Sequence, residues 1–131
     1  MKQKTVFADI DGLLVIHNGE GASRQWLLPH KLVDGAREFL DALEREGVYI
    51  VLVTARKECV REDTVQQLRW MGLIYDQLVM GLGSGPRYLL NDSKPGQPET
   101  CFALTLERNA AIDVGRVIAW MEAQCQSSSN S

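Results

Sequence analysis

Two aspartates, Asp9 and Asp11, follow a β-prone run that starts at Thr5, and Gly12 comes directly after them. A buried carboxylate without a partner costs far more free energy than its packing returns, so the pair must face a ligand or a cation. Open parallel sheets bind ligands in the crevice beyond the carboxyl ends of their strands, and glycine lets the backbone approach a ligand closely. We therefore predict a metal-bound acidic active site at the end of the first strand.

Polar residues also follow two later apolar runs, at positions where a packed core does not need them. Parallel strands place their carboxyl ends at one edge of a sheet, so these residues and the aspartate pair can converge although they are far apart in sequence. The residues are Thr54, Ala55 and Arg56 after the run 48–53, and Asn91 and Asp92 after the run 87–90.

Carboxylates that converge in this way repel one another unless a cation neutralises them. Hard oxygen ligands suit Mg²⁺, which keeps several waters and leaves room for a phosphate oxygen. One aspartate can then attack phosphorus to form an aspartyl phosphate, while the second protonates the leaving oxygen and activates water. The hydroxyl of Thr54, with a cation such as Arg56 or Lys94, would hold the transferring phosphoryl oxygens.

Apolar periodicity predicts the elements that position these residues. Continuous apolar runs are typical of buried parallel strands, and apolar residues at i, i+3, i+4 and i+7 are typical of amphipathic helices. Their alternation indicates a parallel sheet with helices on both faces. We expect strands in the run that opens with Thr5 and at residues 48–53, 76–80, 87–90 and 101–106, and helices at 35–46, at 58–71 and after Asp113. Residues 13–17 and 25–28 are expected to form a small flap. We expect residues 1–125 to form a single domain and residues 126–131 to be a disordered tail.

Three of these stretches, 6–12, 51–54 and 89–92, resemble motifs I, II and IV of the haloacid dehalogenase (HAD) superfamily, in the same order along the chain. The resemblance covers about residues 4–106. It implies a three-layer, Rossmann-like α/β fold with a parallel five-stranded sheet in the order 5-4-1-2-3. The gaps after the first motif and between strands three and four hold no cap domain, so the chain looks like a small capless member.

Carried over to this sequence, the resemblance implies separate roles for the site residues. Asp9 would be the nucleophile and a Mg²⁺ ligand, and Asp11 the general acid and base, binding the metal through its backbone carbonyl. Thr54 would bind the phosphoryl group, and Asp92 would complete the metal site. The remaining expected residues are Asn91 as a further metal ligand, Lys94, favoured over Arg87, as the motif III cation, and Gly12, Ala55, Arg56 and Arg87 as substrate-binding residues.

Composition narrows the class of protein and of partner. The net charge of −3 and the pI near 5.4 show no electrostatic footprint for nucleic acid or an anionic membrane. No apolar run approaches the length of about 18 residues that spans a bilayer, so we expect a cytoplasmic protein. A capless site needs water exclusion from a large substrate or a neighbouring subunit, and we expect a homo-oligomer.

We therefore predict a Mg²⁺-dependent phosphomonoester hydrolase for a small phosphorylated metabolite. A sugar phosphate is one candidate, since residues 76–92 resemble small capless HAD proteins encoded with polysaccharide-biosynthesis enzymes. The alternative is a catalytically silent HAD-fold module that binds a phosphorylated ligand or a protein partner. A response-regulator receiver is disfavoured because the expected third strand ends at Met80 and Gly81, without an aspartate.

Overall fold

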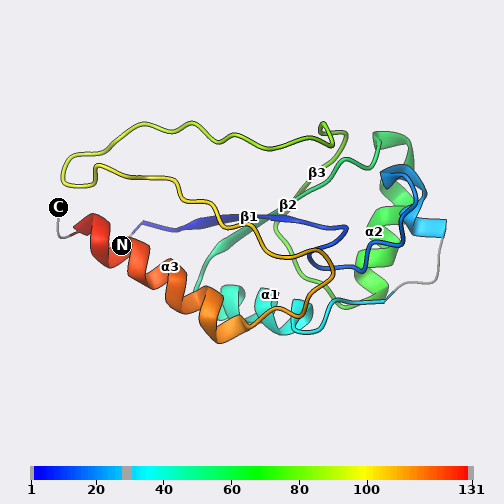
Figure 1. The fold of residues 1–131 in the computed structure, drawn as a ribbon, viewed down its shortest axis with the longest axis horizontal. Helices are drawn as coiled ribbons and strands as arrows, with labels where there is room; N and C mark the ends of the chain where they lie inside the picture. The colour runs from blue at the N-terminus through cyan, green and yellow to red at the C-terminus, as the bar shows by residue number, and fades with distance from the viewer. Residues whose placement is uncertain (1, 28–30, 130–131) are drawn as a thin grey trace.

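The computed structural model describes residues 2–27 and 31–129, with side chains described up to residue 125 in the last helix. Figure 1 shows how the elements are arranged. In chain order they are strand β1 (Thr5–Asp9), 3-10 helix η1 (Ala22–Leu27), helix α1 (Ala36–Arg45), strand β2 (Tyr49–Val53), 3-10 helix η2 (Glu58–Val60), helix α2 (Arg61–Trp70), strand β3 (Gln77–Val79) and helix α3 (Val114–Ser129).

Within the described residues, the sheet has three parallel strands in the order β1-β2-β3. Its register places Asp9 beside Val53, and Val53 beside Val79, so the residues that follow all three strands meet at one edge. The middle strand β2 is buried on both faces, as its continuous apolar sequence predicts. In β1 only one face is covered, because Ala8 is buried whereas Phe7 is 56% exposed.

The prediction of helices on both faces is wrong: α1 and α3 lie on one face of this sheet and build the core. Figure 1 shows α1 and α3 lying together below the strands, with α2 at the end where the strands finish. The apolar positions of α1 recur every three or four residues and are buried. The fully buried side chains of the core include Ile10, Leu14, Leu40, Leu43, Leu52 and Leu68.

The prediction of a five-stranded sheet in the order 5-4-1-2-3 is wrong. Residues 87–90 and 101–106 form no strands; they belong to a long extended excursion, residues 82–107, which we call the arm. Figure 1 shows the arm running from the end of β3 back above the sheet, turning beyond the start of β1 and returning. Parallel strands need a crossover of roughly a dozen or more residues between them. The glycine-rich stretch 81–86 holds no helix, so residues 87–90 leave in the opposite direction and β1 becomes an edge strand instead of a central one.

Smaller elements also differ from the expectation. In place of a hairpin flap, Val15 bridges to Asp11 and to Leu32, and residues 22–27 form η1; residues 28–30 lie outside the described part of the chain. The helix expected after Asp113 is present, and Asp113 caps it: Asp113 Oδ1 accepts a hydrogen bond from the backbone N–H of Arg116 at 3.1 Å. That helix, α3, continues to Ser129, past the point where we expected a tail. Among the described helices, none has the length and apolar character needed to cross a membrane.

Candidate functional site

The last residue of β1 and the turn that follows it carry the two predicted acids. Asp9 and Asp11 flank Ile10, whose side chain is completely buried. Gly12 has φ +93°, and its backbone N–H donates to Val15 O at 2.7 Å, which closes a tight loop. Only glycine adopts this left-handed conformation without strain. The core therefore anchors the turn through Ile10 and leaves one carboxylate on either side of it.

Asp11 is held by a buried arginine. Arg56, which is fully buried, donates from Nε to Asp11 Oδ2 at 2.9 Å and from Nη2 to Asp11 Oδ1 at 2.7 Å. Its remaining nitrogen, Nη1, donates to Thr64 Oγ1 at 3.2 Å and to Gln67 Oε1. A bidentate arginine–carboxylate pair adds geometric specificity as well as energy. Arg56, which we predicted as a substrate-binding residue, therefore fixes the orientation of Asp11 from inside the protein.

Thr54 follows β2 and lies beside the same turn. Its side chain is almost completely buried, and Thr54 Oγ1 accepts a hydrogen bond from the backbone N–H of Arg56 at 3.1 Å. The backbone N–H of Thr54 donates to Val79 O at 3.0 Å. In this structure the Thr54 hydroxyl, which we predicted to bind a phosphoryl group, shapes the turn that carries Ala55 and Arg56; Ala55 is half-buried and Arg56 is fully buried.

Asp9 is the more accessible of the two acids. Its side chain is 42% exposed, against 8% for Asp11. The nearest cation is Arg87, whose Nη2 lies 3.8 Å from Asp9 Oδ1. Burial of the carboxyl raises the pKa of Asp9, and the charge of Arg87 and a backbone hydrogen bond from Ile10 oppose that rise. The result is a carboxylate that is reachable from solvent but less well solvated than a free one.

The other predicted ligands lie on the arm. Lys94 forms an ion pair with Asp92, and its hydrogen bond lowers the pKa of that carboxyl. Both side chains are more than half exposed, and Asn91 nearby is also exposed. The backbone bridge between Lys94 and Gln97 closes the tip of the arm. Within the described residues, no group of three or more His, Cys, Asp or Glu side chains comes together, so the acids of the turn and of the arm are separate here.

One residue that supports the acidic turn was not predicted from the sequence. Asn109, at φ +63°, lies where the arm returns to the body, and its backbone N–H donates to Gly12 O at 2.7 Å. Its side chain accepts from His17 N at 2.7 Å and donates to His17 O at 3.1 Å. Asparagine tolerates left-handed backbone and bonds to nearby backbone groups, but no spacing in the sequence links it to Gly12. The contact ties the base of the arm to the acidic turn.

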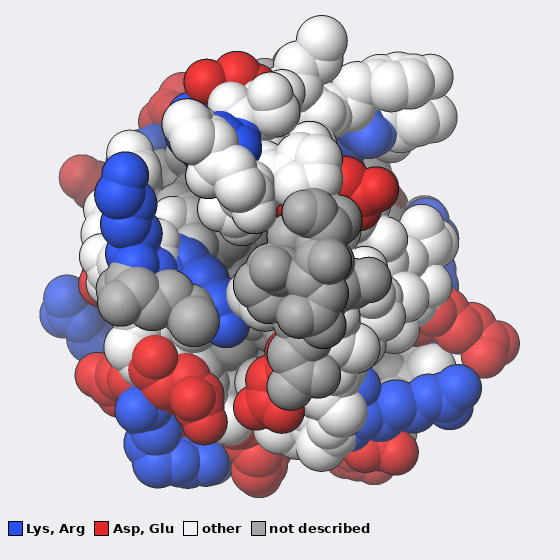
Figure 2. All heavy atoms as spheres, turned by 90° about the vertical axis from the view of Figure 1, so that its left-hand side faces the viewer, with Lys and Arg blue, Asp and Glu red and all other residues white. Residues whose placement is uncertain are grey.

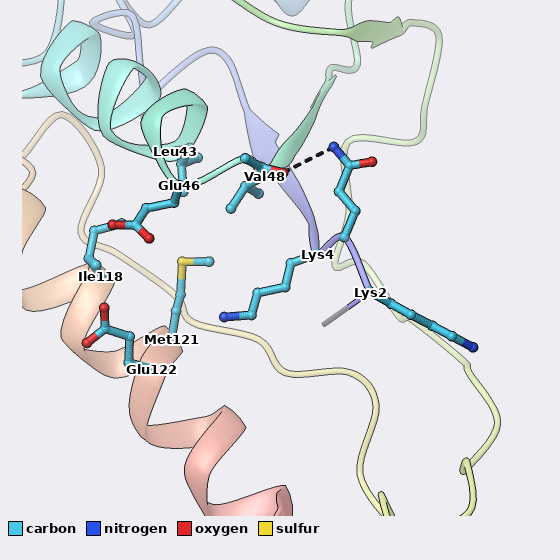
Figure 3. A pocket seen from close by; sticks show the side chains of 10 residues that line it. Lys2, Lys4, Leu43, Glu46, Val48, Ile118, Met121 and Glu122 are labelled. Atoms are coloured by element: carbon cyan, nitrogen blue, oxygen red, sulfur yellow. Dashed lines mark hydrogen bonds between the residues drawn. The ribbon is translucent and has the colours of Figure 1, made fainter.

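Two pockets of the described surface lie away from the acids. A pocket of about 470 Å³ lies at the opposite end of the strands, between the start of β1 and α3, and Figure 3 shows its lining, including Lys4, Met121 and Glu122. A second, of about 390 Å³, lies between Trp26 and Trp70, over α2. The chemistry of the acidic turn locates the candidate site better than either hollow.

Comparison with known proteins gives one likeness in fold. No family model and no curated protein matches this chain. A chain of the solved structure described as "Structure of Pnkp1/Rnl/Hen1 complex" is similar, with a TM-score of 0.54 and 23% sequence identity over 66% of this chain and 30% of that chain. This chain thus corresponds to about a third of that chain's length, and the similarity concerns the fold alone.

Proposed function

We propose that this protein is a Mg²⁺-dependent phosphomonoester hydrolase that works through a phosphorylated Asp9. The observation that carries the proposal is the contrast between its two acids. Asp9 is 42% exposed at the end of β1, whereas Asp11, one residue beyond Ile10, is held by buried Arg56. One carboxylate is placed to react and the other is fixed in orientation, which is the division of labour that covalent catalysis with acid–base help requires.

The reaction follows from those two positions. An Asp9 oxygen attacks phosphorus; its bond to phosphorus forms while the ester P–O bond breaks, and the leaving oxygen takes a proton from Asp11. A water then gives its proton to Asp11 and attacks the same phosphorus, so the Asp9–phosphorus bond breaks and inorganic phosphate leaves. Arg56 occupies one lone pair on each oxygen of Asp11. Each carboxylate oxygen has a second lone pair, so a proton can still bind there.

The residues of the turn suit Mg²⁺. This ion usually takes one or two carboxylates and completes its six positions with waters and phosphate oxygens. The carboxylate of Asp9 and the backbone carbonyl of Asp11 would supply the protein ligands, and the ion would neutralise charge on the transferring phosphoryl group. Arg87, 3.8 Å from Asp9, would orient a phosphate oxygen.

The substrate class that fits is a small phosphorylated metabolite, with a sugar phosphate as one candidate. A second function has support from one observation. Asp92 and Lys94 pair with each other on the arm, so the turn alone offers few groups to the transition state. A protein of this form that binds a phosphorylated ligand without hydrolysing it is the alternative.

The test is a screen of phosphomonoesters with Mg²⁺ and with a chelator, using wild type, Asp9→Asn and the control Asp41→Asn. Asp41 lies on α1, away from the acidic turn. We expect Mg²⁺-dependent release of phosphate by wild type and by the control, and a loss of more than about 10³-fold in Asp9→Asn, because the attacking group is gone. Hydrolysis that survives Asp9→Asn would refute the nucleophile. Binding of a phosphorylated compound without turnover would favour the alternative.

A further inference from the structure

The arm exposes apolar side chains that folding would normally bury. Tyr88 and Leu90 are 87% and 90% exposed on the outgoing limb, and Leu104 is 46% exposed on the returning one. The upper part of Figure 2, where the arm lies, shows mostly uncharged side chains, whereas charges of both signs surround the lower part. A monomer rarely leaves so many large apolar side chains on one extended segment, and such surfaces mark interaction sites.

The same chain also has an open sheet edge. Within the described part of the chain, β1 pairs with β2 on one side and has no strand on the other, so its outer edge can offer backbone N–H and C=O groups to a further segment. Natural edge strands are commonly protected by lysine, proline or a bulge. β1 has none of these between Thr5 and Asp9, and Phe7 on it is 56% exposed. An unprotected edge and an extended apolar segment are complementary in both hydrogen bonding and side-chain character.

We propose that the arm of a second copy of this chain packs along the outer edge of β1 and brings its Asp92 and Lys94 to Asp9. Each copy gives an arm and receives one, because the edge and the arm lie on every chain; exchange of identical elements about a two-fold axis is a low-cost route to a dimer. The number of residues in the arm matches what one partner contributes to a standard interface, about 20–30 residues.

Distances along the chain allow this exchange. The arm begins beside the site, with Arg87 Nη2 3.8 Å from Asp9 Oδ1 of its own chain. Asp92 lies within about 17 Å of extended chain beyond Arg87, so it can reach the site of a neighbour that sits against β1. The role of Asp92 and Lys94 at Asp9 rests on the proposed function, whereas the association of arm and edge does not.

Association is tested first, by sedimentation of wild type beside Leu90→Asp, Phe7→Asp and the control Trp70→Asp. Trp70 is 91% exposed, much like Leu90, but lies on α2. We expect a dimer for wild type and the control, and a dissociation constant at least tenfold higher for the two other variants. Their far-ultraviolet circular dichroism should be unchanged. A wild type that stays monomeric at about 50 μM, or a dimer indifferent to Leu90→Asp, overturns the proposal.

Disulfide trapping then identifies whose arm meets β1. The three native cysteines are replaced by serine; one population carries Phe7→Cys and a second, longer by a tag, carries Leu90→Cys. We expect mixed oxidation to give a cross-linked species with the summed mass of the two chains. If a single chain with both substitutions instead closes on itself, and the mixture gives no cross-link, the arm folds back on its own β1 and exchange is wrong.

The contribution of Asp92 is tested by complementation. Asp9→Asn and Asp92→Asn are each expected to be inactive, whereas a re-equilibrated equal mixture recovers about a quarter of the wild-type rate, since half of the dimers regain one intact site of two. If the mixture cross-links but recovers no hydrolysis, Asp92 does not act in the partner's site. A wild type without hydrolysis refutes the proposed function but leaves the trapping result to decide the exchange.

Discussion

Replacement of Arg56 by methionine tests the most tightly built part of the candidate site. Arg56 is fully buried and donates four side-chain hydrogen bonds, two to Asp11 and one each to Thr64 and Gln67. Methionine is of similar length and apolar, so the volume is largely kept while the charge and every donor are lost. Asp11, whose side chain is only 8% exposed, is then left with an uncompensated charge.

We expect the substitution to cost about 3–5 kcal/mol in the free energy of unfolding, the usual effect of removing one partner from a buried ion pair. Small domains are stable by only about 5–15 kcal/mol, so this is a large share of the total. Urea unfolding followed by circular dichroism measures it. Arg61→Met is the control, since the Arg61–Glu58 pair is exposed at the surface, where ion pairs contribute little.

The double variant Arg56→Met with Asp11→Asn shows whether stability is lost through the unpaired charge on Asp11 or through the other contacts of Arg56. If the cost of Arg56→Met comes from the charge stranded on Asp11, the double variant recovers much of the lost stability, and the coupling exceeds about 1 kcal/mol. A cost for Arg56→Met below about 1.5 kcal/mol, or strictly additive effects, would show that Asp11 does not depend on Arg56 for its position.

Two further comparisons test the charge of Asp9 and the packing at Gly35. Burial raises the pKa of Asp9, so its ionisation weakens the folded state as the pH rises through that raised value. Asp9→Asn should therefore be more stable than wild type at pH 7, and the difference should shrink towards zero below the ordinary pKa of 3.8. Urea unfolding across that pH range measures the difference. We expect it to be small, because solvent screens the charge of a half-exposed side chain. Gly35→Ala should destabilise more than Gly19→Ala, although both have φ near +85°, because a Cβ at Gly35 would lie 2.4 Å from Ile112 O whereas one at Gly19 meets nothing. Alanine in this conformation costs about 1–2 kcal/mol by itself, and equal losses in the two variants would contradict the predicted clash.

Apart from the flap, local pattern predicted the main helices and strands of the first two thirds of the chain. The helix predicted at residues 35–46 is α1, Ala36–Arg45, and the strand predicted at 48–53 is β2, Tyr49–Val53. Both follow from periodicity, which depends only on residues that are neighbours in sequence. The same reasoning placed Asp9 and Asp11 at the carboxyl end of β1, and Thr54 and Arg56 after β2, at one edge of the sheet.

Local pattern could not decide where the later apolar runs go. Residues 87–90 and 101–106 have the composition of strands, yet a strand exists only if a partner edge meets it in the right direction. That direction depends on the connection before it, and the stretch 81–86 is too short to carry a crossover. This is why the arm, with Asp92 and Lys94, left the sheet that the sequence predicted for it.

The division between Asp9 and Asp11 has the same origin. The sequence determined that two carboxylates would end the first strand, because their spacing to its apolar run is local. Only the tertiary structure decided that Asp11 would be neutralised by Arg56 from a neighbouring strand end while Asp9 stays half exposed. Burial and charge pairing are set by which elements pack together in space, and the sequence near either aspartate does not encode that contact.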